Sequence, residues 1–328
     1  MEDIAPLLHA KQSFWQKYIF STDHKVIAMQ YMFTGIFMAL VGGFMSYVFR
    51  MQLAYPGESV PGYGIVSALD YNALVTNHGT IMIFWVAMPV LLAGLGNFLI
   101  PLMIGCDDMV FPRLNRLSYQ IFFLSTVVIL VSLVVPGGGF GGAWTAYPPL
   151  SSEATYSLTP WGAPLWVIAV ALEFVAFLMG GINFVTTVMN SRAPGMKWNK
   201  IPIIIWMIVI ASILFMVSVG PLVAGAVMLL FDQLLGTSFY NPAGGGDPLL
   251  WQHLFWFLAH PEVYVLILPA MGIVAEVIAN NTRKPLWGYK SIVYSSIFLG
   301  FMSFIVWAHH MFLTGMGTII SSFFQTTT

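Results

Sequence analysis

The chain has 328 residues, of which 58% are hydrophobic and only 8% are charged, and its formal net charge is -1. A soluble domain carries about a quarter charged residues, so this chain lacks the polar side chains to cover a water-facing surface. Nothing in the charge balance suggests a nucleic-acid partner. The single cysteine, Cys106, excludes a disulfide framework within the chain and a multi-cysteine metal site. We therefore predict an all-α, polytopic transmembrane helix bundle.

Seven apolar runs are long enough to cross a membrane, which takes about 20 residues. The polar N-terminus lacks the features of a cleaved secretory signal, so the first run is expected to stay as an anchor. The predicted spans are Val26–Arg50, Tyr71–Ile104, Leu117–Val135, Trp161–Asn190, Ile201–Leu235, Leu249–Ala279 and Ser291–Phe312. Because the chain contains no repeat or linker, residues 1–328 are expected to form a single transmembrane domain.

The basic residues test this topology. With seven spans, eleven of the 12 Lys and Arg residues fall on the side of the N-terminus, and Arg50 is the exception. Short loops rich in Lys and Arg stay in the cytoplasm. The N-terminus and the loops at 105–116, 191–200 and 280–290 are therefore predicted to be cytoplasmic. The outer segments at 136–160 and 241–248 are rich in glycine and proline, which suits either close approach to a bulky partner or plain turns.

Three histidines lie within the last two predicted spans. His260 and Tyr264 are four residues apart and share a helix face. His309 and His310 are adjacent and diverge by about 100°, yet both can reach a metal that lies between helices. Three imidazoles suit zinc, copper, iron or nickel, so the spacing alone does not choose the metal. The alternative is three unrelated histidines that form hydrogen bonds within the membrane.

Other polar residues in the spans are also candidates for function. Glu262 points about 200° away from His260, which suits proton delivery better than ligation, and burial should keep its carboxyl protonated. His78 precedes a glycine, which would let a flat haem approach, or it bonds to a neighbouring helix. Arg50 either pairs with a polar edge of a cofactor or extends to the membrane interface.

The inner loop after the second span carries Asp108, with Asn97 and Asn115 nearby. This group could form the mouth of a hydrated proton path, and the alternative is a solvated loop. His24 lies before the first span and has no assigned role.

The sequence strongly resembles subunit I, the catalytic subunit, of haem–copper terminal oxidases, of the cytochrome c oxidase type with a glutamate in the sixth span. The similarity runs from Phe20-Ser-Thr-Asp-His-Lys25 to the last residue. The motifs that carry it are Phe98-Leu-Ile-Pro-Leu-Met-Ile-Gly105, Trp144-Thr-Ala-Tyr-Pro-Pro149, Asn241-Pro-Ala-Gly-Gly-Gly-Asp-Pro248, Gln252-His-Leu-Phe-Trp-Phe257, His260-Pro-Glu-Val-Tyr264 and Trp307-Ala-His-His-Met-Phe312.

The resemblance implies roles for the residues of the last two spans. His260, His309 and His310 match the three ligands of the active-site copper. Tyr264 matches a tyrosine that is joined covalently to the first of these and supplies an electron and a proton when the O–O bond breaks. Glu262 matches the shuttle that carries protons between a water channel and the active site.

The resemblance also implies roles for residues of the first four spans. Asp108 matches the cytoplasmic entrance of that channel, which Asn97 and Asn115 would line. His78 matches one of two axial ligands of the low-spin haem. Arg50 would lie near a substituent of that haem's ring, and Trp144 near the haem and its proton-loading region.

A family member of this type reduces O2 to water with electrons from cytochrome c and pumps protons. The implied cofactors are two haems of the a type and copper. The implied partners are subunit II with a copper site that receives electrons, subunit III and other membrane subunits, and cytochrome c or a fused cytochrome c domain. The expected location is the cytoplasmic membrane of a bacterium rather than the mitochondrial inner membrane.

Two alternatives remain open. A quinol-oxidising member of the superfamily would use polar side chains shortly before the low-spin haem histidine, but Ala73 stands where such relatives carry a glutamine. A non-redox proton or ion transporter would use the same buried carboxyls, but it would leave Tyr264 and the histidine pair unexplained.

The chain also departs from the family pattern. The family subunit has about twelve spans, so this chain is expected to be its N-terminal part, without the ligand of the oxygen-binding haem, the second low-spin haem ligand and the lysine of a second proton path. Ala275 stands where many relatives carry a serine of that path, and Ala176 and Phe177 replace a serine pair of the aspartate channel. Glu173 and Glu276 match no family role, and a neighbouring chain is the expected partner of Glu173. His253 is expected to be structural.

Overall fold

The computed structural model describes residues 13–153 and 157–328, so the N-terminal residues through Gln12, Lys11 included, lie outside the described residues. Within that part, six helical segments are long and apolar enough to cross a membrane, which confirms six of the predicted spans. They are α1 (His24–Ala54), α2 (Ala68–Thr80) continued through α3 (Leu95–Ile104), α4 (Pro112–Ser132), α6 (Gly162–Asn190), α7 (Ile203–Leu235) and α8 (Pro248–Thr282).

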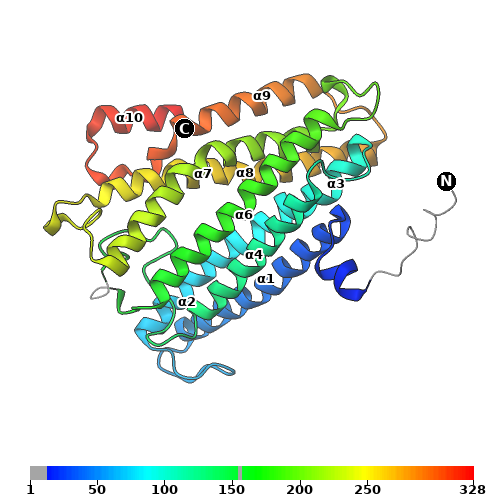
Figure 1. Cartoon of the computed structure of the whole chain (residues 1–328). Coiled ribbons are helices and arrows are strands. Elements are labelled where there is room, and N and C mark those ends of the chain that lie inside the picture. Colours follow the sequence, from blue (N-terminus) through cyan, green and yellow to red (C-terminus); the bar gives the residue numbers. More distant parts are fainter. Residues whose placement is uncertain (1–12, 154–156) are drawn as a thin grey trace.

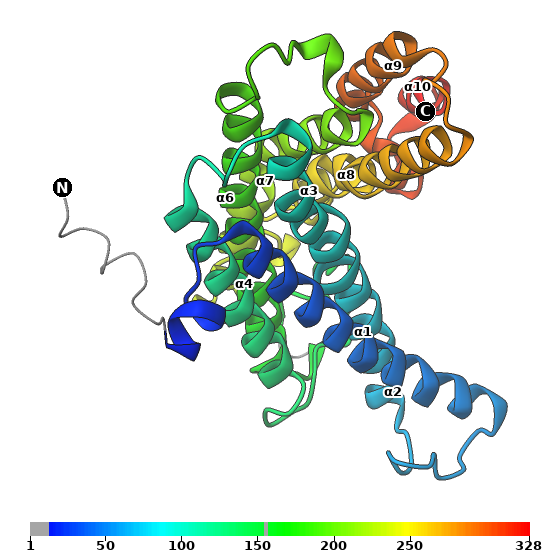
Figure 2. The same cartoon turned by 90° about the vertical axis from the view of Figure 1, so that its right-hand side faces the viewer.

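The helices form one bundle. In both views α1 and α2 lie on one side, the last helices lie on the other, and α4, α6 and α7 lie between them (Figures 1 and 2). The outward face of α1 leaves large apolar side chains exposed, such as Phe33 and Leu40, whereas Ile27 and Met38 are buried. Exposed apolar side chains of this size are expected on a surface that contacts lipid.

Local sequence signals mark the helix ends. The Asp23 side chain accepts hydrogen bonds from two backbone N–H groups at the start of α1, and Ser67 and Asp70 form a capping box at the start of α2. Gly105 ends α3 with a left-handed φ of 75°. The prediction placed the start of the third span at Leu117. The helix begins earlier, at Pro112, a residue type that favours the first turn of a helix. The prediction started late because the first turns carry charged residues, which an apolar count leaves out.

The second span is irregular in its middle. Two π-helical stretches, η3 (Ile81–Ala87) and η4 (Pro89–Gly94), join α2 to α3. Proline has no backbone N–H, so Pro89 interrupts the regular helical hydrogen bonds. A Cβ at Gly35 of α1 would lie 2.9 Å from the side chain of Val90, which shows how closely α1 approaches this stretch.

The seventh predicted span, Ser291–Phe312, is wrong as one continuous helix. α9 (Tyr289–Met302) is shorter than the other spans and ends before the histidine pair. It is followed by η7 (Ser303–Ile305), η8 (Trp307–His310), η9 (Phe312–Thr314) and α10 (Gly317–Thr327). The Ser303 hydroxyl donates to the Gly300 carbonyl at 2.6 Å, and such bonds compete with the helical pattern. Left-handed Gly315 and Gly317, with φ of 78° and 79°, turn the chain into α10.

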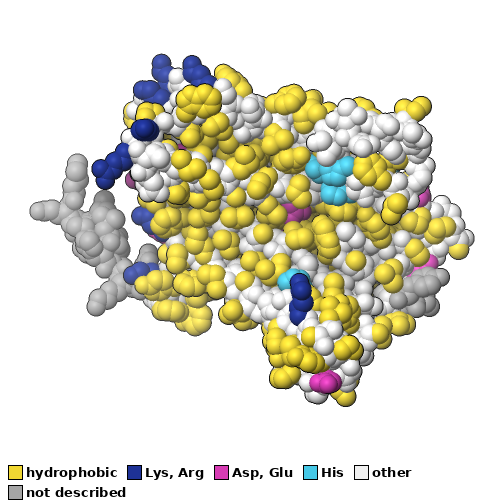
Figure 3. All heavy atoms as spheres, turned by 180° about the vertical axis from the view of Figure 1, so that it is seen from behind, with side chains coloured by type: hydrophobic (Ala, Val, Ile, Leu, Met, Phe, Trp, Pro, Cys, Tyr) yellow, Lys and Arg dark blue, Asp and Glu magenta, His cyan; other side chains and the backbone are white. Residues whose placement is uncertain are grey.

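Basic side chains gather at one end of the bundle (Figure 3). The end of α3 and the loops at 191–200 and 283–288 all lie at one end of the bundle in Figure 1. The gathering of basic side chains at one end agrees with the predicted topology, in which the basic loops share one side of the membrane.

Candidate metal centre

His260, His309 and His310 come together in space. One ring nitrogen from each lies within 4.8 Å of the others, a separation at which they could hold one metal ion. His309 Nε2 and His310 Nε2 are 2.9 Å apart, and His260 Nδ1 and His310 Nε2 are 3.3 Å apart. Two nitrogens that each lie about 2.0 Å from one metal ion are about 3–4 Å apart, so these two separations are close to those of a shared metal. The break after α9 places the pair on the short helix η8, against α8.

Neighbouring side chains orient two of these rings. The His310 ring stacks on the Trp256 indole, with centroids 3.8 Å apart and planes 9° apart. The Trp256 indole N–H in turn donates to the Tyr147 hydroxyl at 2.5 Å. His309 Nδ1 forms a hydrogen bond with Thr328 Oγ1 at 3.0 Å, which leaves Nε2 free to face the cluster. Contacts of this kind fix the orientation of metal-binding imidazoles.

Tyr264 and Glu262 lie beside the cluster on α8. The Tyr264 ring is 4.8 Å from the His260 ring at an angle of 70°, as the four-residue spacing predicts. Glu262 is buried, and neither of its carboxyl oxygens has a hydrogen-bond partner among the described residues. A carboxyl in such surroundings is unfavourable as an anion, which is the condition expected of a group that carries a proton rather than a charge.

A cavity opens next to the histidines. Its lining includes Tyr147, Gln252, His309 and His310. Figure 3 shows a patch of histidine side chains on the face of the molecule that it draws. The cavity therefore gives a ligand access to the cluster from the side of His309 and His310.

His78 has one ring nitrogen engaged in a hydrogen bond to α1. Its Nδ1 lies 2.9 Å from the Gly42 carbonyl oxygen. A carbonyl only accepts, so Nδ1 carries the proton of this bond, and Nε2 is the ring nitrogen left for another partner. Arg50 is exposed on α1, eight residues beyond Gly42 and about 80° further around that helix.

Trp144 packs beside the glycine that follows His78. A Cβ at Gly79 would lie 3.6 Å from the Trp144 indole, which is an ordinary van der Waals contact. The Trp144 ring also lies 5.6 Å from Phe255 and 5.9 Å from Trp256. Trp144 therefore connects the surroundings of His78 with the tryptophan that supports His310.

Asp108 lies at the basic end of the bundle and is half-buried. Burial raises the pKa of its carboxyl above the ordinary value of 3.8, and the Met109 backbone N–H and the charge of His24 oppose the rise. Deeper in the bundle, Asn115 Nδ2 donates to Asn97 Oδ1 at 2.6 Å. The structure thus brings the two asparagines into direct contact, and Asp108 lies nearer than they do to the basic end of the bundle.

Three further polar residues join this network, and sequence reasoning missed them. His24 is buried rather than solvated, and its Nδ1 donates to the Asn97 carbonyl at 2.7 Å. The Tyr31 hydroxyl donates to Ser118 Oγ at 3.1 Å, and Ser118 donates to the Asn115 carbonyl at 2.7 Å. One signal was available, because His24 and Tyr31 are seven residues apart and share a face of α1.

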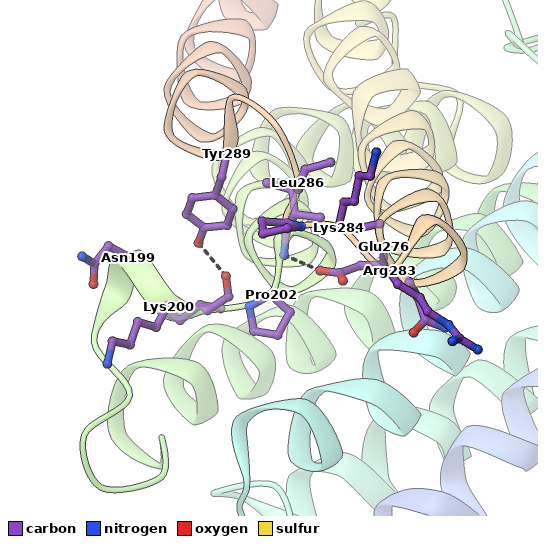
Figure 4. A pocket seen from close by; sticks show the side chains of 13 residues that line it. Asn199, Lys200, Pro202, Glu276, Arg283, Lys284, Leu286 and Tyr289 are labelled. Atoms are coloured by element: carbon purple, nitrogen blue, oxygen red, sulfur yellow. Dashed lines mark hydrogen bonds between the residues drawn. The ribbon is translucent and has the colours of Figure 1, made fainter.

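Glu173 and Glu276 are the two acidic residues that matched no family role. Glu173 is 0% exposed within this chain, so the prediction that it pairs with a neighbouring chain is wrong. Glu276 accepts the first backbone N–H of α7, from Ile203, at 2.7 Å. It lines a pocket with Lys200, Arg283 and Lys284, drawn in Figure 4. An acceptor at a helix N-terminus satisfies a donor that has no partner within the helix, so Glu276 has a structural role.

His253 lies outside the metal cluster. It is exposed, and its Nδ1 accepts a hydrogen bond from the Trp307 indole N–H at 3.3 Å.

Residues 26–328 match the protein family described as "Cytochrome C and Quinol oxidase polypeptide I". The chain belongs to this family. It is 42% identical over 334 residues to "Alternative cytochrome c oxidase subunit 1" of Bradyrhizobium diazoefficiens, with 98% of this chain and 55% of that protein covered.

Two other relatives have similar identity and coverage. "Cytochrome c oxidase subunit 1" of Cereibacter sphaeroides is 40% identical over 348 residues, with 98% of this chain and 60% of the relative covered. "Cytochrome c oxidase subunit 1" of Thermostichus vulcanus is 41% identical over 321 residues, with 98% and 56% covered. The chain thus spans less than two thirds of the length of each of these relatives.

Proposed function

We propose that this chain supplies the histidine half of the oxygen-reducing centre of a haem–copper cytochrome c oxidase. The observation that carries the proposal is the group of His260, His309 and His310 beside Tyr264, with the buried carboxyl of Glu262 on the same helix. The family and the names of the relatives support the same activity. The reaction is the reduction of O2 to water with electrons from cytochrome c, coupled to proton pumping.

In this proposal the three histidines hold copper through neutral ring nitrogens, and Trp256 and Thr328 keep two of the rings in place. The copper and a haem iron, when bound, supply electrons to O2. Tyr264 lies in contact with His260, where its hydroxyl can provide one more electron and a proton when the O–O bond breaks.

Protons for this chemistry would enter near Asp108 and pass Asn97 and Asn115, which are already joined by a hydrogen bond. Glu262 would hold a proton on a carboxyl oxygen and release it toward the metal site. Because its carboxyl is buried without a partner, it is more stable neutral than charged, which makes each release conditional on a new proton arriving.

His78 would bind the iron of a low-spin haem through Nε2, since Nδ1 is committed to Gly42. Arg50 and Trp144 would lie at the periphery of that haem. The two haems are proposed to be of the a type. Residues 1–328 would form one domain of a subunit that works with subunit II, subunit III and other membrane subunits, in the cytoplasmic membrane of a bacterium with the N-terminus inside.

The test is made on the complete oxidase purified from its host. We expect haem absorbance, bound copper, and oxygen consumption with reduced cytochrome c. H309A should remove copper and abolish oxygen reduction, because a metal that loses one of three imidazoles loses a large part of its affinity. The matched control is H253A, which changes a histidine outside the cluster and should keep both. Retention of copper and activity in H309A would reject the ligand assignment.

The same preparation separates the alternatives. Oxygen consumption with a quinol but not with cytochrome c would assign the chain to the quinol-oxidising branch of the family. Absence of haem bands would exclude both oxidase readings and leave a non-redox transporter.

A further inference from the structure

Glu173 is an ionisable side chain in the interior of the bundle that the proposed function does not use. It lies near the middle of α6 and is 0% exposed, and neither carboxyl oxygen has a hydrogen-bond partner among the described residues. An isolated carboxylate is very unfavourable in such surroundings, so the carboxyl is held in its protonated form. A buried neutral carboxyl is a group that can give up a proton and regain it.

Phe177, one turn further along α6, marks the direction in which Glu173 points. The Phe177 ring lies 6.1 Å from the Tyr31 ring of α1 and 5.9 Å from the Phe122 ring of α4. The carboxyl therefore faces the part of the bundle where α1 and α4 meet.

Tyr31 stands at the inner end of a row of hydrogen bonds. The row runs from Asn97 to Asn115 at 2.6 Å, continues through the Asn115 carbonyl to Ser118 at 2.7 Å, and reaches Tyr31 at 3.1 Å. Asn97, Asn115, Ser118 and Tyr31 are all buried. Such a row of hydroxyl and amide groups gives a polar route from the basic end of the bundle toward Glu173.

Glu262 of α8 is likewise buried, and neither of its carboxyl oxygens has a hydrogen-bond partner among the described residues. Between Trp166 and Asn183, Glu173 is the only polar side chain that α6 carries. A proton that moves from the Tyr31 side of α6 to its α8 side therefore has one side chain on this helix to use.

We propose that Glu173 is a proton-carrying residue that takes protons from the Asn97–Tyr31 row and releases them toward α8. In each passage the O–H bond on a Glu173 oxygen breaks, and the proton moves toward α8 directly or through water. A proton from the Tyr31 side then forms a new O–H bond on the carboxylate. No electrons move, and Glu173 returns to its starting state. This role rests on the proposed function, because the oxygen-reducing centre consumes the protons.

The test uses the complete oxidase and compares the parent with E173Q and E173D. E173Q keeps the shape of the side chain without an exchangeable carboxyl proton, and E173D keeps the carboxyl. We expect single-turnover proton uptake, followed with a pH-indicator dye, to slow about tenfold or more in E173Q and to recover largely in E173D. Infrared difference spectra of the parent should contain a carboxylic acid band that shifts in D2O, is absent in E173Q and moves in E173D.

Haem absorbance, copper content and oxygen reduction in the parent report separately on the proposed function. If the parent has all three and E173Q takes up protons at the parent's rate, the proposal for Glu173 is overturned while the oxidase assignment stands. If E173Q is slow but the parent spectrum has no band that responds to E173D, Glu173 acts only through packing, and the proposal is overturned too. If E173Q does not assemble, the carboxylic acid band is compared between the parent and E173D. A band that moves in E173D supports the proposal, and a band that does not move overturns it.

Discussion

The partners of each ring nitrogen decide which histidines can act as metal ligands. His78 donates from Nδ1 to a backbone carbonyl, which leaves Nε2 as the available nitrogen. His309 uses Nδ1 for Thr328 and turns Nε2 toward His310. His253 has no such arrangement, because its Nδ1 accepts from the Trp307 indole outside the cluster. Residues of the same type thus differ in chemistry because different neighbours hold them.

Asp108 is the residue for which pH dependence can be stated. Burial raises the pKa of its carboxyl above 3.8, so the folded protein binds this proton more tightly than the unfolded chain does. The contribution of Asp108 to stability is therefore fully present below the ordinary aspartate pKa and is lost as the pH rises through the raised value. We predict that infrared titration of 13C-labelled aspartate shows a midpoint above 3.8 that D108N removes. D107N, which changes its exposed neighbour, should retain it, and a midpoint at or below 3.8 would contradict the burial argument.

At the scale of helices, close approach of backbones sets how α7 and α8 pack. A Cβ at Gly272 of α8 would lie 2.8 Å from the Cα of Ile204 on α7, and backbone cannot move aside as a flexible side chain can. Glu276, one turn further along α8, satisfies the first N–H of α7. Packing and hydrogen bonding thus act at the same helix junction, next to the pocket of Figure 4.

We predict that G272A separates α7 from α8 and destabilises the protein by about 1–3 kcal/mol, as overpacking of a filled contact does. Thermal unfolding of the detergent-solubilised oxidase should show a lower Tm. G180A is the matched control, because a Cβ at Gly180 of α6 meets nothing within 4 Å and alanine favours the helix. A Tm for G272A equal to or above that of G180A would show that the helices tolerate the added methyl group.

At the scale of the whole molecule, the charge distribution is the feature that orients the bundle. Basic side chains gather at one end, where the loops at 191–200 and 283–288 lie (Figures 1 and 3). The loop after α1 carries Ser59 and belongs to the opposite end. Because basic loops stay in the cytoplasm, the two ends should differ in access from outside the cell.

We predict that S59C reacts with a membrane-impermeant maleimide in intact cells and that N199C reacts only after lysis. Both positions are exposed, so burial does not account for a difference. The native Cys106 serves as an internal control on the inner side, and burial raises the pKa of its thiol and slows its reaction. Labelling of N199C in intact cells would reverse the assigned orientation.

The sequence by itself determined the features that depend on adjacent residues. Apolar length predicted six of the spans, since each must cover the width of a membrane, and Asp23 and Gly105 marked helix ends through local hydrogen bonds and backbone conformation. The histidines on α8 and η8 were also recognisable, because ionisable residues in apolar runs are rare.

Only the tertiary structure decided which polar groups meet. His24, Tyr31 and Ser118 joined the asparagines because α1, α3 and α4 cross there, and no spacing along one helix encodes that crossing. The end of α9 at Met302 and the packing of η8 against α8 are features that an apolar count does not contain. Glu173 is buried because α6 packs between α4 and α7. Contacts between helices depend on how distant segments fit together, and that fit is a property of the folded chain.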